Sequence, residues 1–137
     1  MKNTTQSITV VQEYFEAFPQ GNMDKVLNIF HEDCLIISVR KEDRKKDQLH
    51  GTYKTKENAK QFLQNIVNQF DTIEFIVKEI IADKQVVFAN GKFKHQIKTT
   101  SKMFISDWVQ RCIIEDGKIK EYQFYEDSAA FVEASQL

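Results

Sequence analysis

The stretch 103–127, MFISDWVQRCIIEDGKIKEYQFYED, decides the fold of this chain. Two runs rich in β-branched and aromatic residues flank Asp116-Gly117. Both residues of this dipeptide tolerate the positive φ that a two-residue type I′ turn requires. The stretch therefore predicts a long β-hairpin.

The first strand of this hairpin carries charge on an apolar face. Side chains in a strand alternate with a period of two, so Asp107 and Arg111 share one face with three apolar residues, Ile105, Val109 and Ile113. Burying a charged side chain in the core costs free energy unless the side chain is paired or lies in a cavity. We expect Asp107 to face a cavity, where a desolvated carboxyl group suits acid–base catalysis. A salt bridge to Arg111 and an outward orientation are the alternatives.

Length and composition predict a single globular domain over residues 1–137. A chain of this size buries enough apolar surface to fold without disulfides or metals. The two cysteines, Cys34 and Cys112, form neither a disulfide framework nor a zinc motif, and we expect both to be small buried hydrophobes in a reducing compartment.

Charge and hydropathy exclude two classes of partner. With 19 basic and 20 acidic side chains the net charge is −1, so no global field attracts nucleic acid. No run of about 18 apolar residues is present, and no apolar segment follows the N-terminal lysine. We therefore expect a soluble, cytoplasmic protein with neither nucleic acid nor membrane as partner.

Hydrophobic periodicity places helices in the first half of the chain and strands in the second. Apolar residues recur at helical spacing in three early segments, and the period changes to two after Thr72. This order predicts an α+β fold with an antiparallel sheet that is free to curl around the helices. The predicted helices are 7–18, 22–30, 55–70 and 128–135, and the predicted strands are 33–39, 72–82, 86–97 and the two arms of the hairpin.

Several loose motifs accompany this order. They are Tyr14 before Gly21, the break Gly21-Asn22-Met23-Asp24, His50-Gly51, Asp116-Gly117-Lys118-Ile119, and Tyr125-Glu126-Asp127-Ser128-Ala129-Ala130. With the order of elements, they resemble the nuclear transport factor 2-like superfamily, in its SnoaL-like or ketosteroid-isomerase-like branch, over nearly the whole chain. The resemblance implies a cone-shaped α+β barrel in which a curved antiparallel sheet wraps around three N-terminal helices. It also implies an apolar pocket at the open end of the cone and a homodimer formed by the outer face of the sheet.

Of the three catalytic residues of ketosteroid isomerases, one has a counterpart in this chain and two do not. Tyr14 matches the tyrosine that stabilises an oxyanion in ketosteroid isomerases, although packing in the core is the alternative for it. The aspartate base of those enzymes falls at Ser38, and their second oxyanion donor falls at Val109. Steroid isomerisation by that mechanism is therefore not expected.

His95 is the second candidate proton carrier. If the turn after its strand is 99–101, odd residues pair with odd residues, and His95 lies opposite or diagonal to Asp107. A turn at Thr100-Ser101 pairs odd with even residues instead and separates the two side chains.

The remaining site residues follow from the same assignment of faces. The strand that contains Trp108 and Phe104 directs them away from Asp107, so we expect these two aromatic residues at a homodimer interface. The expected pocket-lining residues are Ser38, Val109, Arg111, Tyr122, Phe124 and Glu126.

Three hypotheses follow for the function. The first is cofactor-independent acid–base catalysis on a small hydrophobic molecule, with Asp107, His95 and Tyr14 as catalytic residues. The second is a non-catalytic ligand-binding protein, and the third is a dimeric interaction module whose pocket is filled by side chains. No phosphate-binding loop, nucleophile triad or metal-ligand spacing is present, so we expect neither cofactor nor metal.

Overall fold

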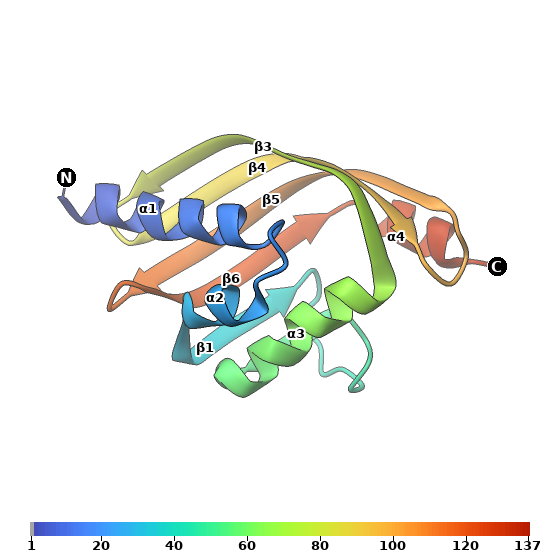
Figure 1. Cartoon of the computed structure of the whole chain (residues 1–137), viewed down its shortest axis with the longest axis horizontal. Coiled ribbons are helices and arrows are strands. Elements are labelled where there is room, and N and C mark those ends of the chain that lie inside the picture. Colours follow the sequence, from blue (N-terminus) through green and yellow to red (C-terminus); the bar gives the residue numbers. More distant parts are fainter. Residues whose placement is uncertain (1) are drawn as a thin grey trace.

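A computed structural model of the chain describes residues 2–137, and in this range four helices accompany one six-stranded sheet. The strand order is β2-β1-β6-β5-β4-β3, and neighbouring strands are antiparallel except for β1 and β6. The predicted α+β class with a curved sheet is confirmed (Figure 1). The elements are α1 (Lys2–Ala17), α2 (Met23–Asn28), β1 (Phe30–Ser38), β2 (Gly51–Lys54), α3 (Thr55–Gln69), β3 (Phe70–Asp83), β4 (Val86–Ile97), β5 (Met103–Glu115), β6 (Lys118–Glu126) and α4 (Ser128–Ser135).

Helices α1, α2 and α3 lie on the concave side of the sheet, and α4 lies at the end where β4 turns into β5 (Figure 1). Helix α1 buries Val11, Tyr14 and Ala17, which fall on one helical face. Helix α3 likewise buries one stripe, which includes Phe62 and Leu63. The core therefore lies between the helices and the inner face of the sheet.

The predicted hairpin is confirmed, and its turn has the expected geometry. Asp116 and Gly117 have φ angles of 54° and 71°, which is the left-handed conformation that a type I′ turn needs at both positions. Glu115 pairs with Lys118 across this turn. The hairpin places β5 and β6 side by side over most of their length.

Strands β1 and β2, at one edge of the sheet, differ from the prediction. Strand β1 begins earlier, at Phe30, because this residue pairs with Ile119 of β6, and the pairing is parallel where we predicted antiparallel strands. A short strand that the sequence did not predict, β2, pairs with β1 through Gly51 and Ser38. These long-range pairings place Ser38 between Gly51 of β2 and Phe124 of β6.

Strand β3 curves over the helices at the other edge of the sheet. Its pairing with β4 shifts between Thr72 and Glu74 and again between Val77 and Glu79, and such bulges bend a strand. Opposite this curve, a Cβ atom at Gly91 would lie only 1.7 Å from the backbone oxygen of Ile76. The close approach of the two strands therefore requires glycine at this position.

Both cysteines are buried and unpaired, as predicted. Within residues 2–137 no helix is long and apolar enough to cross a membrane.

Candidate functional site

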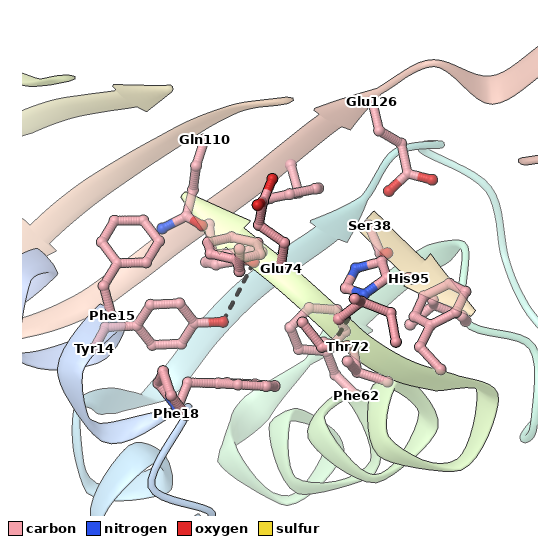
Figure 2. Close-up of a pocket in the computed structure, with 18 residues that line it drawn as sticks. Tyr14, Phe15, Phe18, Ser38, Phe62, Thr72, Glu74, His95, Gln110 and Glu126 are labelled. Carbon is pink, nitrogen blue, oxygen red and sulfur yellow. Dashed lines mark hydrogen bonds between the residues drawn. The ribbon is translucent and has the colours of Figure 1, made fainter. Parts of the chain in front are cut away.

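A cavity of about 420 Å³ lies between the inner face of the sheet and helices α1 and α3. Figure 2 shows Tyr14, Phe15 and Gln110 on one side of it, and Ser38, His95 and Glu126 on the other. The wall is mostly apolar, with a few polar groups, which is typical of a small-molecule site. Its residues are Tyr14, Phe15, Phe18, Pro19, Ser38, Leu49, Phe62, Ile66, Phe70, Thr72, Ile73, Glu74, Phe75, His95, Gln110, Tyr122, Phe124 and Glu126.

Stacked aromatic rings form one wall of the cavity. The ring of Trp108 lies behind this wall, with its centroid 5.0 Å from that of Phe75 and 5.5 Å from that of Phe124, and both pairs are nearly parallel. Phe15 of α1 packs against the same indole at 5.4 Å. The packed rings form an apolar wall that suits a planar or apolar ligand.

Two tyrosine hydroxyls meet at the α1 side of the cavity. Tyr14 is buried on helix α1, and its hydroxyl oxygen lies 3.4 Å from that of Tyr122 on β6. Burial raises the pKa of both phenols above the ordinary value, so both are protonated at neutral pH. One hydroxyl donates to the other, and the remaining proton is available to a ligand. The sequence therefore placed Tyr14 and Tyr122 correctly on the cavity wall.

His95 enters the cavity from β4, stacked between Phe70 and Phe93 at centroid distances of 4.5 and 4.2 Å. Its Nδ1 lies 3.0 Å from the hydroxyl of Thr72. No hydrogen bond to Nε2 is made by any residue in the range 2–137. Burial lowers the pKa of His95 to about 4, so at neutral pH the imidazole is uncharged.

Glu126 and Ser38 lie on the same side of the cavity as His95 (Figure 2). The Glu126 side chain is only 6% exposed, and its Oε2 lies 3.2 Å from Nε2 of His50, which forms an ion pair only if the imidazole is protonated. The two atoms are not oriented for a hydrogen bond, so neither has a hydrogen-bond partner among the described residues. Behind them, the ring of Phe131 from α4 packs on His50 at 4.3 Å.

Four polar residues that contribute to this site were not predicted, namely His50, Thr72, Glu74 and Gln110. Gln110 is buried on β5, where its Nε2 donates to the Cys112 sulfur at 3.4 Å and its Oε1 has no partner among residues 2–137. The alternation of β5 carried a signal for Gln110, because the even positions hold the bulkier aromatic residues Phe104 and Trp108. The pairing of Thr72 with His95 depends on the bulge in β3 and left no such signal.

The prediction that Asp107 faces the cavity is wrong. Asp107 is exposed on the outer face of the sheet, opposite Lys92 of β4, whereas His95 pairs with Phe104. The turn after β4 pairs odd with even residues, which is the alternative that separates the two groups. The structure therefore brings His95 and Tyr14 to the cavity and leaves Asp107 outside it.

The predictions for the other odd-numbered residues of β5 are wrong for the same reason. Val109 and Arg111 point outward and do not line the cavity, and Arg111 Nη1 lies 3.9 Å from Glu121 Oε2 instead of pairing with Asp107. The even positions face inward, so Phe104 and Trp108 are fully buried in the core and cannot form a dimer interface. Ser38, Tyr122, Phe124 and Glu126 do line the cavity.

Within residues 2–137 no group of three or more His, Cys, Asp or Glu side chains could hold a metal ion. The polar atoms of the cavity are hydroxyls, an imidazole, an amide and carboxyl groups. Such groups bind and move protons, and the arrangement is suited to acid–base chemistry on an organic molecule.

Comparison with known proteins places the fold. The sequence matches the family described as SnoaL-like domain over residues 11–122. Among curated proteins none matches. A nuclear transport factor 2-like protein from Burkholderia xenovorans has a similar solved structure, with 22% identity, 97% of this chain and 98% of that chain covered, and a TM-score of 0.84.

Two further solved structures of this fold contain ligands. TerC, crystallised with polyporic acid, is 20% identical, with 94% of this chain and 97% of that chain covered and a TM-score of 0.77. A protein from Catenulispora acidiphila with a ketosteroid isomerase-like fold, in complex with trimethylamine, is 12% identical, with 92% and 91% covered and a TM-score of 0.74. At these identities the likeness shows the fold alone.

Proposed function

The chain belongs to the SnoaL-like domain family, and from that premise we propose that it binds a small, largely apolar molecule in the cavity and catalyses a cofactor-independent acid–base step on it. His95 is the proton acceptor in this proposal, and the Tyr14–Tyr122 pair supplies a hydrogen-bond donor. Asp107 has no part in it, because its side chain lies on the outer face of the sheet.

The state of His95 carries this proposal. A general base must be unprotonated at the working pH and must reach the substrate. His95 lines the cavity with an uncharged imidazole, and Thr72 and two stacked rings hold it in place. Nε2 has no hydrogen-bond partner in the range 2–137, so a ligand proton can take that position.

The solved structures with ligands support the choice of a small molecule as partner. TerC was crystallised with polyporic acid, and the Catenulispora acidiphila protein with trimethylamine. One ligand is an acid and the other an amine, so the fold by itself does not fix the charge of the ligand.

A non-catalytic ligand-binding protein is the second candidate function. Ser38 favours it, because this hydroxyl lies on the cavity wall and occupies the position that resemblance assigns to the aspartate base of ketosteroid isomerases. A serine hydroxyl does not accept a proton at neutral pH. The two candidates differ in whether His95 moves a proton once a ligand is bound.

Hydrogen exchange on a ketone probe separates the two functions. 2-Indanone has acidic hydrogens next to its carbonyl, and a base that removes one of them in D₂O leads to deuterium incorporation visible by proton NMR. We expect the wild-type protein to accelerate this exchange and His95→Gln to lose the acceleration while still binding 2-indanone. The control is Asp107→Asn, which should exchange at the wild-type rate because its side chain is exposed on the outer face. Binding without acceleration by the wild type would select the non-catalytic function.

We further propose that two copies of the chain associate through the outer face of the sheet, with different residues from those first predicted. Large apolar side chains are exposed there, among them Phe88 at 46%, Val109 at 41% and Tyr125 at 43%. Val109 and Tyr125 are direct cross-strand neighbours, so the patch is continuous at this point. We expect sedimentation at micromolar concentration to give a dimer that Val109→Glu converts to a monomer. A wild-type monomer would contradict the proposal.

A further inference from the structure

The charged groups on the cavity wall have one sign. Glu74 and Glu126 line it, whereas none of the lining residues that the structure describes is Lys or Arg. His95 adds no positive charge at neutral pH, because burial lowers its pKa to about 4. An anionic ligand would therefore meet carboxyl groups and no compensating cation inside a mostly apolar cavity.

Glu126 is the more important of the two carboxyl groups. Its side chain is 6% exposed and lies on the cavity wall, and its Oε2 has no hydrogen-bond partner among residues 2–137. A buried carboxylate is costly unless it is paired and hydrogen-bonded. Nε2 of His50 lies 3.2 Å from this oxygen but is not oriented to donate, so no described residue donates a hydrogen bond to Oε2 of a carboxyl group that lines the cavity.

Glu74 differs from Glu126 in its surroundings. Its side chain is half exposed, and Lys92 Nζ lies 4.0 Å from its Oε1. Solvent screens such a group, so its effect on a bound charge is small. Glu74 is therefore a matched control for Glu126 on the same cavity wall.

The aromatic wall adds a second attraction for positive charge. The faces of Phe and Tyr rings carry negative potential and attract a cation within about 6 Å of the ring centroid. Six Phe residues and two Tyr residues contribute to the lining of the cavity that Glu126 also lines. Such a wall also accommodates the apolar part of an organic ligand.

We infer that the cavity selects a protonated amine with an apolar body, and that Glu126 receives its ammonium group. The inference rests on the proposed function, since it names the chemical class of the small molecule that the cavity takes. The inference predicts that, among ligands of the same shape, the cavity binds the positively charged one most tightly.

Three probes of equal length test this preference: 4-phenylbutylammonium, 4-phenylbutanol and 4-phenylbutanoate. Their binding at pH 7 is measured through the fluorescence of Trp108, which is the single tryptophan of the chain and packs behind the cavity wall. We expect the ammonium to bind on the order of tenfold tighter than the alcohol, because a hydrogen bond to a charged group is stronger than a neutral one. We expect the carboxylate to bind more weakly than the alcohol.

Two variants test whether Glu126 causes the preference for the ammonium. Glu126→Gln should lower the affinity for the ammonium to that for the alcohol and leave the alcohol unchanged, whereas Glu74→Gln should preserve the preference. Retained alcohol binding shows that the cavity of each variant is folded. Equal affinities of the wild type for ammonium and alcohol, or tighter binding of the carboxylate, would overturn the inference without any variant. If none of the three probes binds, the proposed binding function fails as well, so the two failures are distinguishable.

Discussion

His95 should make the stability of this protein sensitive to mild acid. Its pKa is lowered from 6.5 to about 4 in the folded state because the ring is buried between Phe70 and Phe93. In the unfolded chain the same imidazole is solvated and takes up a proton near its ordinary pKa. Below pH 6.5 the unfolded state therefore binds more protons than the folded state, and the free energy of unfolding falls as the pH is lowered.

The magnitude follows from the size of this pKa difference. Each tenfold difference in proton affinity corresponds to about 1.4 kcal/mol, so a decrease from 6.5 to about 4 amounts to about 3 kcal/mol. The loss begins near pH 6.5 and is complete near pH 4. Above pH 7 both states carry a neutral imidazole, and His95 contributes no pH dependence.

Urea unfolding followed by Trp108 fluorescence at several pH values between 7 and 4 measures this effect. The wild type is compared with His95→Gln at each pH, so that the contribution of His95 is separated from that of the rest of the chain. We expect the stability of the wild type relative to the variant to fall by about 3 kcal/mol over the range. A difference that stays constant with pH would show that the pKa of His95 is the same in the folded and unfolded states, and would contradict the burial of its imidazole between the two rings.

Three substitutions test the architecture by the same unfolding assay. Gly91→Ala should destabilise the protein by more than about 3 kcal/mol, because the added Cβ would overlap the carbonyl oxygen of Ile76; a loss below about 1 kcal/mol would contradict the close strand contact. Asp127→Ala should cost about 1 kcal/mol, since the carboxylate accepts a hydrogen bond from the backbone N–H of Ala130 at 3.0 Å as the N-cap of α4, and an unchanged midpoint would refute this cap. Asp107→Asn should change stability by less than about 0.5 kcal/mol, and a large loss would mean that the carboxylate is buried after all.

Local patterns in the sequence predicted most elements. The spacing of Ala59, Phe62 and Leu63 indicated a helix with one buried face, and α3 buries all three residues. The dipeptide Asp116-Gly117 indicated the hairpin, and both residues have positive φ. These features depend on residues a few positions apart, where the geometry of a helix or a tight turn is fixed by local sterics.

The candidate site was only partly predictable. Tyr14, Ser38 and Glu126 were expected on the cavity wall and are found there. Tyr14 comes from α1, and the parallel pairing of β1 with β6 joins the strands that carry Ser38 and Glu126. Thr72 and His50 could not be predicted, since a bulge in β3 brings Thr72 to His95 and the segment before β2 brings His50 to Glu126.

The sequence by itself determined that β5 is a strand with two different faces, but only the tertiary structure decided which face is inside. Both faces contain apolar residues: Val109 is on one and Trp108 is on the other. The length of the turn between β4 and β5 sets the register that pairs His95 with Phe104, and a shift of one residue would reverse every side chain of the strand. That register buries Trp108 and exposes Asp107, because the bulky aromatic residue fills the space under the helices while the charged group keeps its contact with water.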